Sequence, residues 1–338
     1  MDLHDIYDGK TVLVIGASGL IGSNLVERLL LQPRIRVIAL GRSSARLERA
    51  LSPYLGDTRL QLLEHDINDP LPEGLGPVAC IFHAGSSASG KVVRDDPMSV
   101  IGANLRGTAT ALDYLRAQVA AGGPTGSFAV FSSATVYGSP VARDVRVDEP
   151  ATACAEPLDD PHAVYSESKR MAEVIACAAA RQYGIPVTIA RFGYVYGWCR
   201  NLPQTAFYDF LARAAQGEDI VFRGSGLCRR DNIHVDDAVT GLLHACEYGE
   251  SGIAYNVSAN GELGNFAALD EMADVLAEVA NAGGARHMRV VASRDMPRQP
   301  GLLMDNARLK ALGWRVKVSL EEGVRRTFER FAMSGPMI

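Results

Sequence analysis

The sequence predicts an α/β fold, in which a doubly wound parallel sheet carries a smaller C-terminal cap. Short, uninterrupted apolar runs such as TVLVIG, RVIALG, ACIFHAG and FAVFSS recur in the first half of the chain. Amphipathic segments of helical period separate several of these runs. Such alternation is typical of parallel strands that are buried on both faces by helices. After about Tyr194 the pattern loosens into glycine-rich turns and two amphipathic helices, which indicates a smaller region built on the first.

The ends of each expected strand and helix are predicted from the local sequence pattern. The first strand begins at Thr11 and is followed by the helical segment LIGSNLVERLLLQ, and the second strand begins at Arg36. Further strands are expected in LQLLEHD, ACIFHAG, FAVFSS and PVTIARFG. A long helix is expected over 161–183, because a proline stands near its start and Gly184 directly follows its end.

The composition argues against several classes of protein. Of 338 residues, 47% are hydrophobic and 22% are charged, which suits one large domain or two closely joined ones. The net charge of −5 argues against a nucleic-acid-binding protein. No apolar run approaches the roughly 18 residues of a membrane helix, and MDLHDIYDGK does not resemble a signal peptide. The six cysteines show no C-x-x-C pairing, so we expect reduced cysteines in a cytoplasmic protein.

A glycine-rich loop follows the first strand. Gly16, Gly19 and Gly22 form a G-x-x-G-x-x-G pattern between that strand and the first helix, rather than the G-x-G-x-x-G of the dehydrogenase fingerprint. Glycines at this place allow a tight turn and the close approach of a pyrophosphate to backbone N–H groups. The loop therefore predicts dinucleotide binding. We assign residues 1–193 to a Rossmann-type dinucleotide-binding domain, with a strand also from about 229–258. Residues 194–228 and 259–338 are assigned to a substrate-binding cap.

The end of the second strand indicates which dinucleotide is bound. NAD-preferring sites place an acidic residue there to hold the ribose 2′-hydroxyl. In this chain Gly41 stands at that position and is followed by Arg42 and Ser43. A guanidinium offers a planar fork of donors that suits a 2′-phosphate. We therefore predict NADP as the cofactor, with NAD as the alternative.

The stretch YSESK places Tyr165 four residues before Lys169, on one face of the expected helix. This pair is weak evidence alone, but it follows the glycine loop and FSSATVYG in order. Together the three resemble the extended short-chain dehydrogenase/reductase family, the NAD-dependent epimerase/dehydratase group that acts mainly on nucleotide-sugars. HDI, FHAG, NLRGT, ARFGYVYG and RRDNIHVDD also match, so the resemblance covers nearly the whole chain.

The resemblance implies roles for individual residues. Tyr165 is the catalytic acid/base, Lys169 holds the nicotinamide ribose and lowers the Tyr165 pKa, and Ser133 orients the reacting oxygen of the substrate. A free phenol has a pKa of about 10, and a cation about 4 Å away would bring it towards about 7. The residues implied to contact the cofactor are Gly16, Ser18, Gly19, Leu20, Ile21, Gly22, Arg42, Ser43, Asp66, Ile67, His83, Ala84, Gly85, Asn104, Ser132, Tyr165, Lys169 and Phe192. Those implied to contact the substrate are Ser133, Tyr165, Tyr194 and Arg230.

The two residues that follow Ser133 narrow the choice among the reactions of this group. A 4,6-dehydratase of this group has an Asp–Glu pair directly after the Ser/Thr, and relatives that epimerise at C3 and C5 have a cysteine there. This chain has Ala134 and Thr135, so both reactions are disfavoured. We favour a 4-keto-sugar reductase, in line with Arg42 and with the closing LLMDNARLKALGW. A 4-epimerase with tightly bound NAD stays open, because FSSATVYG resembles the 4-epimerase motif. A catalytically idle dinucleotide sensor or scaffold is disfavoured by the intact Ser133, Tyr165 and Lys169.

The substrate end departs from the family pattern at one position. Arg230 matches the arginine that pairs with the substrate diphosphate, whereas Tyr194 replaces the asparagine that many members have. A nucleotide-sugar is therefore the expected substrate, and a substrate without a diphosphate stays open. IHVDD is interpreted as a capped helix start rather than a metal site, and we expect no metal. The resemblance also implies a homodimer through the two long helices of the first domain.

Overall fold

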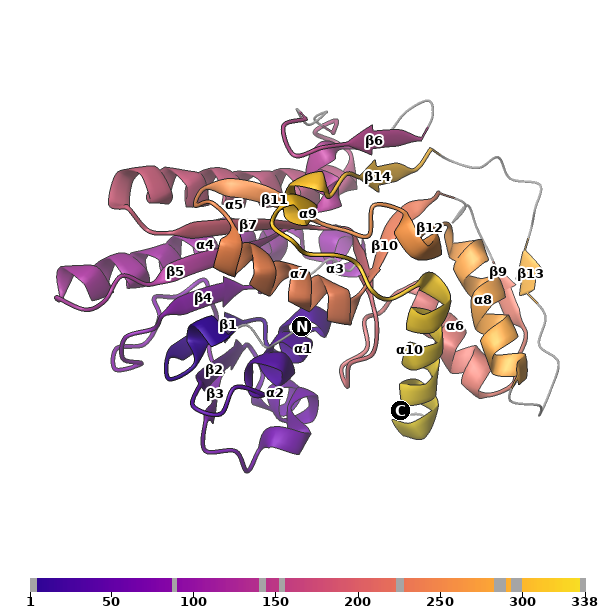
Figure 1. The fold of residues 1–338 in the computed structure, drawn as a ribbon, viewed down its shortest axis with the longest axis horizontal. Helices are drawn as coiled ribbons and strands as arrows, with labels where there is room; N and C mark the ends of the chain where they lie inside the picture. The colour runs from indigo at the N-terminus through magenta and orange to yellow at the C-terminus, as the bar shows by residue number, and fades with distance from the viewer. Residues whose placement is uncertain are drawn as a thin grey trace.

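The computed structural model describes residues 5–86, 90–139, 144–151, 156–222, 228–282, 290–292 and 300–334. Its centre is a seven-stranded sheet of order β11-β7-β5-β4-β1-β2-β3, in which every neighbouring pair is parallel (Figure 1). The strands are β1 (Thr11–Ile15), β2 (Arg36–Gly41), β3 (Leu60–Glu64), β4 (Cys80–His83), β5 (Ser127–Ser133), β7 (Val187–Phe192) and β11 (Ile253–Val257). The order reverses between β1 and β4, so the first strand–helix turn lies at the switch point where open α/β sheets bind ligands.

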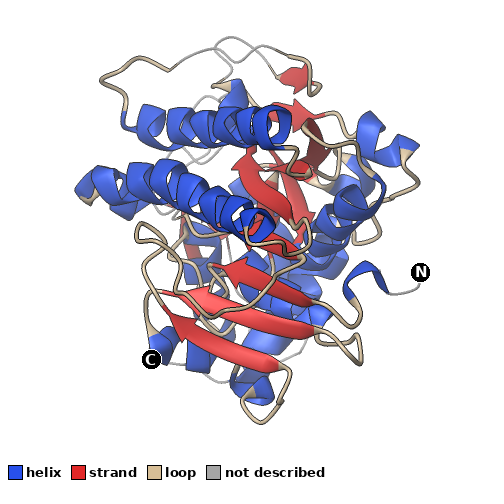
Figure 2. Cartoon of the chain, turned by 90° about the vertical axis from the view of Figure 1, so that its left-hand side faces the viewer, coloured by secondary structure: helices blue, strands red, loops and turns tan. Residues whose placement is uncertain are grey.

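Helices cover both faces of this sheet, which confirms the predicted doubly wound fold. Along β1, Val12 and Val14 face one hydrophobic cluster, and Leu13 and Ile15 face the other. The first cluster includes side chains of α1 (Leu20–Leu29) and α7 (Val235–Tyr248). The second includes α4 (Pro97–Ala120) and α5 (Pro161–Tyr183), two long helices packed side by side (Figure 2).

The predicted helix over 161–183 is confirmed at both ends. Asp160 accepts the backbone N–H of His162 and caps the start, and Pro161 occupies the first helical position. Gly184 ends the helix in the left-handed conformation, with φ of 67°, which glycine adopts without steric cost. The sequence-based boundaries were accurate because both termini carry a local signal.

A second, smaller sheet has the order β12-β10-β14-β6, with β8 also paired to β10. Its strands are β6 (Val145–Val147), β8 (Tyr194–Tyr196), β10 (Arg230–His234), β12 (Phe266–Ala267) and β14 (Leu302–Met304). It draws β6 from the first half of the chain, and β10 joins it while β11 joins the large sheet. A two-stranded sheet pairs β9 (Ile220–Phe222) with β13 (Val290–Ala292).

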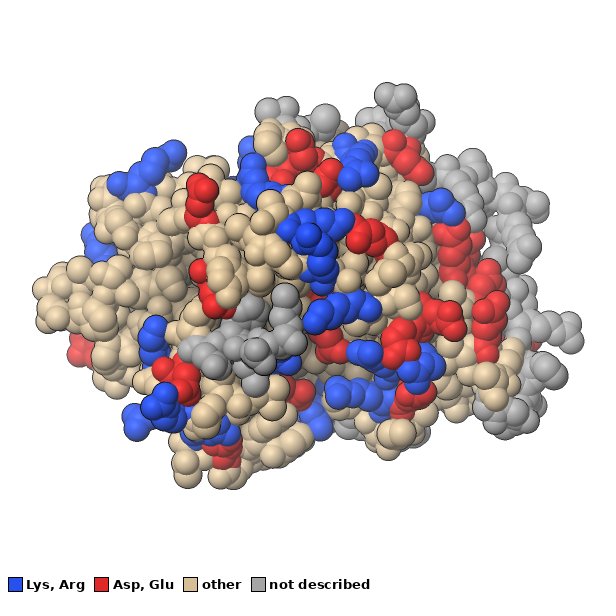
Figure 3. Space-filling view, in the orientation of Figure 1, with Lys and Arg blue, Asp and Glu red and all other residues tan. Residues whose placement is uncertain are grey.

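Three helices form a separate hydrophobic cluster beside the smaller sheet: α6 (Ala206–Ala215), α8 (Leu269–Ala282) and α10 (Leu320–Ser334) (Figure 1). The remaining helices are α2 (Ser44–Ala50), α3 (Gly90–Asp95) and α9 (Ala307–Ala311), and the short 3₁₀ turns are Asp5–Tyr7, Ser52–Tyr54, Ala134–Tyr137 and Glu262–Gly264. Acidic and basic side chains lie intermixed over this part of the surface (Figure 3), where Glu322 of α10 pairs with Arg325 and Arg326. No helix in the described ranges is long and apolar enough to cross a membrane.

Candidate active site

The glycine loop joins β1 to α1 at the switch point of the large sheet. Gly16 has a φ of 79°, and a Cβ there would lie 2.6 Å from the carbonyl oxygen of Ala84. A Cβ on Gly22 would collide with the Gly16 carbonyl, so these two positions require glycine. Gly19 is the N-cap of α1 and no side chain caps this helix. Its first N–H groups are therefore available to phosphate oxygens, and the loop fits a dinucleotide pyrophosphate.

Ser133, Tyr165 and Lys169 come together where β5 meets α5. The Ser133 hydroxyl lies close enough to the Tyr165 phenol to lower its pKa. The Lys169 ammonium lies 5.7 Å from the centre of the Tyr165 ring and donates a hydrogen bond to the carbonyl oxygen of Phe131 at 2.6 Å. The Lys169 side chain is buried and that of Tyr165 is half-buried. The sequence-predicted set therefore forms one cluster.

The electrostatics of this cluster correct one expectation. Burial raises the pKa of Tyr165 to about 12, although the neighbouring Ser133 hydroxyl acts in the opposite direction. Burial lowers the pKa of Lys169 to about 8 and the charge of Glu173 opposes this. The predicted lowering of the Tyr165 pKa towards 7 is wrong for this arrangement, because Lys169 is directed at a carbonyl and desolvation of the phenolate dominates. Tyr165 is consequently a protonated phenol at neutral pH.

His83 is the last residue of β4, and its burial and hydrogen bonds fix its protonation state. Its Nε2 lies 3.1 Å from the carbonyl oxygen of Ala103, and its Nδ1 accepts the N–H of Gly85 at 3.4 Å. These partners fix the tautomer with hydrogen on Nε2. Burial lowers the pKa of His83 to about 3, so the imidazole is neutral. It holds Ala84 and Gly85 against the glycine loop.

Asn104 lies between the two long helices. Its amide donates to the Ser168 hydroxyl at 2.8 Å, and Ser168 precedes Lys169 on α5. Ser132 donates a hydrogen bond to Glu173. Phe192 is buried against Phe131, with ring centres 5.2 Å apart. The side chains of Asn104, Ser132 and Phe192 thus support the cluster by packing and hydrogen bonding.

The predicted adenosine end lies at the tips of β2 and β3. Arg42 is exposed, and Ser43 caps α2 by accepting the backbone N–H of Arg46. The Asp66 carboxylate accepts the backbone N–H of Asn68, and Ile67 is buried. The sequence did not predict Asn201, which follows β8 and donates to the carbonyls of Ser18 and Arg46 at 3.1 and 2.7 Å. This amide ties the loop after β8 to the glycine loop.

The predicted substrate residues Tyr194 and Arg230 stand at the starts of paired strands, β8 and β10. The Arg230 guanidinium lies 5.0 Å from the centre of the Tyr194 ring. The neighbouring Arg229 is neutralised by Glu271 at 2.7 Å. Arg230 forms no such ion pair within the described ranges, so its charge is available to an anionic ligand.

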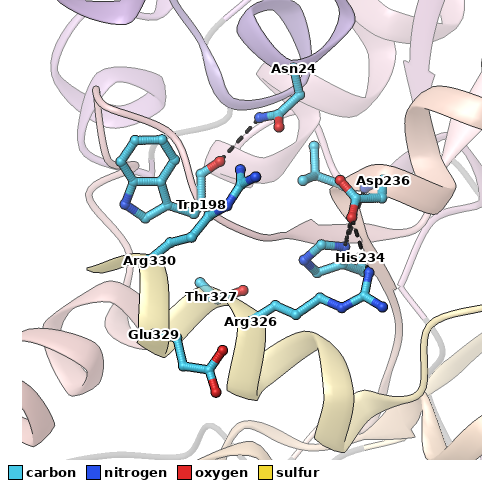
Figure 4. A pocket seen from close by; sticks show the side chains of 9 residues that line it. Asn24, Trp198, His234, Asp236, Arg326, Thr327, Glu329 and Arg330 are labelled. Atoms are coloured by element: carbon cyan, nitrogen blue, oxygen red, sulfur yellow. Dashed lines mark hydrogen bonds and ion pairs between the residues drawn. The ribbon is translucent and has the colours of Figure 1, made fainter. Parts of the chain in front are cut away.

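A cavity of about 260 Å³ lies elsewhere, between α1, α7, α10 and the loop after β8 (Figure 4). Its polar side chains bond to one another: His234 and Arg326 both pair with Asp236, and Asn24 donates to the Trp198 carbonyl. None of the sequence-predicted site residues lines it. His234 also caps α7, as expected for IHVDD, and no group of three metal-ligating side chains was found in the described part of the chain.

The chain is similar to known proteins over most of its length. The model of the NAD dependent epimerase/dehydratase family matches residues 12–258. UDP-glucuronic acid decarboxylase 3 of Arabidopsis thaliana is 29% identical over 323 residues, covering 95% of this chain and 89% of that protein. A dTDP-glucose 4,6-dehydratase from Streptomyces venezuelae, solved with NAD bound, superposes with a TM-score of 0.75 at 27% identity, covering 96% and 97% of the two chains. Another from Bacillus anthracis, in complex with NAD, shares the fold at 21% identity, with a TM-score of 0.79 and coverage of 96% and 97%.

Proposed function

Because the chain belongs to the NAD dependent epimerase/dehydratase family, we propose that it is an NAD(P)-dependent oxidoreductase acting at a carbinol or keto carbon of a nucleotide-sugar. The specific reaction we propose is reduction of a 4-keto-sugar. One observation carries this proposal. Tyr165 is a protonated phenol beside the Ser133 hydroxyl, while the two residues after Ser133 are Ala134 and Thr135. The cluster can give a proton to a keto oxygen, and these two neighbours supply neither a carboxylate nor a thiol.

The chain's own residues account for the proton half of the reaction. The nicotinamide cofactor, when bound, supplies hydride to the keto carbon. In the proposed step Ser133 donates a hydrogen bond to the keto oxygen, and Tyr165 then transfers its phenolic proton to that oxygen. Lys169 is proposed to hold the ribose hydroxyls of the bound cofactor. Together, the hydride and the proton convert the ketone to a carbinol.

The cofactor we propose is NADPH. Gly41 leaves no carboxylate at the end of β2, and Arg42 is exposed beside it. The glycine loop and the uncapped N-terminus of α1 fit the pyrophosphate. Arg230 is proposed to bind the substrate diphosphate and Tyr194 to lie against the sugar. In this proposal residues 1–193 hold the dinucleotide, and 194–228 with 259–338 hold the sugar.

A second candidate is favoured by the relatives named decarboxylases. Oxidation of a sugar acid at C4 gives a β-keto acid, which loses carbon dioxide, and the resulting ketone is then reduced. Ser133, Tyr165 and Lys169 would serve both redox steps, and the NAD would be regenerated in place. A 4-epimerase would likewise retain NAD. Both candidates would therefore keep the same NAD through each catalytic cycle, whereas a reductase exchanges its oxidised cofactor after each turnover.

The quaternary structure is also a proposal. The outer face of α5 exposes Met171 and Val174, and the helix lies beside α4. We propose that these two helices pair with their copies in a homodimer. Sedimentation of the purified protein would give the mass of two chains; a monomer would contradict this.

The first experiment identifies any dinucleotide released when the purified protein is denatured. The emptied protein is then titrated with NADPH and NADH and assayed with dTDP- and UDP-4-keto-sugars, UDP-glucose and UDP-glucuronic acid. A reductase binds NADPH much more tightly than NADH and consumes it with a 4-keto-sugar. Retained NAD with interconversion of UDP-glucose and UDP-galactose would replace the reductase with an epimerase. Release of carbon dioxide from UDP-glucuronic acid would replace it with a decarboxylase, and no turnover with any sugar would leave a dinucleotide sensor.

A further inference from the structure

A buried ion pair lies directly behind the catalytic cluster. Glu173 of α5 and Arg191 of β7 are joined by two hydrogen bonds of 2.8 Å, Nε to Oε1 and Nη2 to Oε2. Their side chains are only 6% and 7% exposed. Removing two charges from water is costly, and only good geometry with further hydrogen bonds offsets that cost. The other partners of this pair therefore decide what it does.

On one side the pair fixes the two elements that carry the cluster. Ser132, which precedes Ser133 on β5, donates its hydroxyl to Oε1 of Glu173. Lys169 lies one helical turn before Glu173 and donates to the carbonyl of Phe131, the residue before Ser132. Strand β5 and helix α5 are thus bonded to each other at two adjacent points, and Ser133 and Lys169 are held at one separation.

On the other side the pair fixes the turn that leaves Ser133. Nη1 of Arg191 donates to the Tyr137 hydroxyl at 2.9 Å and to the carbonyl of Glu149 at 3.0 Å. Tyr137 ends the 3₁₀ turn that begins directly after Ser133, and its hydroxyl donates to Asn256 of β11 at 2.7 Å. The guanidinium on β7 therefore links the turn after β5 to the segment after β6 and, through Tyr137, to β11.

Some of the ionisable groups around Lys169 are charged and others are neutral. Burial alone would drive its amine towards the neutral form, and the Glu173 carboxylate opposes this. The imidazole of His83 on β4 is neutral, because burial and the nearby Lys169 lower its pKa to about 3. Tyr165, on the same helix as Lys169, is also neutral. Glu173 is the charged group that acts on Lys169, and it is bonded to Arg191 of β7.

We propose that the Glu173–Arg191 pair is a positioning element for the catalytic cluster, holding Ser133 and Lys169 in register and keeping the Lys169 amine charged. This inference rests on the proposed function, since it takes the charged amine to be the working form. Neither Glu173 nor Arg191 touches the reacting atoms; both act through Lys169 and Ser133.

The test follows the titration of Lys169 directly, by NMR of protein carrying ¹³Cε-labelled lysine. The sequence has only five lysines, and Lys169→Met assigns the signal. Glu173→Gln should lower the Lys169 titration midpoint by about one pH unit or more, because a buried charge a helical turn away is removed. Arg191→Lys keeps the charge but loses the fork, so it should lower stability and leave the midpoint within a few tenths. Glu167→Gln, an exposed position on α5, is the control and should change nothing.

Kinetics supply the second readout. In Glu173→Gln the alkaline limb of kcat/KM for ketone reduction should move to lower pH with the Lys169 midpoint, and kcat should fall more than KM rises. An unchanged Lys169 midpoint in folded Glu173→Gln would overturn the proposal. If that variant does not fold, the wild-type titration decides, because a Lys169 midpoint below pH 7 would leave the amine uncharged and overturn the proposal. The NMR titration needs no turnover, so a failure of the proposed reductase activity is seen separately.

Discussion

The large sheet is built from strands of four to seven residues that are mostly apolar and buried, whereas the smaller sheet has strands of two to five residues. In the large sheet Val12, Leu13 and Val14 are fully buried and bond only through their backbone. In the smaller sheet Asp231 and Asn232 of β10 are buried, and their side chains make the bonds. Hydrophobic burial therefore stabilises the first sheet, and specific polar contacts define the second.

The difference has a chemical consequence. Around the large sheet, acid-base groups such as His83 on β4 and Tyr165 on α5 are added to a framework of buried apolar side chains. In the smaller sheet Asp231 is part of the framework, accepting the N–H groups of Met304 and Gly261. We therefore expect the large sheet to control catalysis and the smaller sheet to control how the protein responds to its substrate, while one titratable group in each sheet makes stability depend on pH.

The largest expected effect tests the catalytic role of the large sheet. Tyr165→Phe removes the phenolic proton and should lower kcat for ketone reduction by about 10³-fold, within the usual range for loss of a general acid. Cofactor affinity, measured by fluorescence titration with NADPH, should stay within a few-fold. Tyr183→Phe, an exposed position on the same helix, is the matched control. Activity within tenfold of the wild type in Tyr165→Phe would assign the proton to another group.

The second prediction sets the two sheets against each other as the pH changes. Burial raises the pKa of Asp231 to about 7, above its value in the unfolded chain. Its contribution to stability is therefore full below about pH 4 and is lost as pH rises towards 7. Burial lowers the pKa of His83 to about 3, so its contribution is full above about pH 6.5 and is lost as pH falls. Each swing is up to about 4 kcal/mol.

Urea unfolding between pH 4 and pH 8 measures both effects. The difference in unfolding free energy between the wild type and Asp231→Asn should shift in favour of the variant as pH rises. The difference between the wild type and His83→Gln should shift in favour of the variant as pH falls. Parallel stability curves for all three proteins would show that neither group titrates differently in the folded and unfolded states.

The contrast between the sheets also explains what could be predicted from sequence. The large sheet and the long helix were predicted because apolar runs, Pro161 and Gly184 are local signals. The cluster of Ser133, Tyr165 and Lys169 was predicted from motifs. The smaller sheet was not, because Asn232 bonds to residues more than 30 positions away and no local pattern marks such a contact. The Tyr165 pKa was mispredicted because sequence spacing gives the distance to a charge but not the burial of the phenol.

The third prediction concerns those polar contacts. The amide of Asn232 donates to the carbonyls of Asn265 and Ala267, both at 3.0 Å. Asn232→Leu leaves two buried carbonyls without this donor and should lower the unfolding free energy by about 2–3 kcal/mol. Gln61→Leu, an exposed change on β3 of the large sheet, should lie within about 0.5 kcal/mol of the wild type. Equal losses in the two variants would contradict the view that polar contacts define the smaller sheet.

The smallest effect separates the two ends of the proposed site. Arg42→Ala at the tip of the large sheet should raise KM for NADPH about tenfold, equivalent to about 1.4 kcal/mol, and leave KM for NADH unchanged. Arg230→Ala in the smaller sheet should raise KM for the nucleotide-sugar by a similar factor without changing either cofactor constant. Arg49→Ala, exposed on α2, and Arg229→Ala, whose charge Glu271 already neutralises, are the controls.

Which of these KM values changes in each variant matters more than the size of the change. A rise in both cofactor constants for Arg42→Ala would mean that Arg42 contacts a part common to the two dinucleotides, and NADP preference would lose its support. An unchanged sugar constant in Arg230→Ala would mean that the substrate carries no diphosphate at this position. If Arg230→Ala does raise the sugar constant, Tyr194→Leu should reproduce part of that rise, because the Tyr194 ring lies against the Arg230 guanidinium and would orient it towards a bound phosphate.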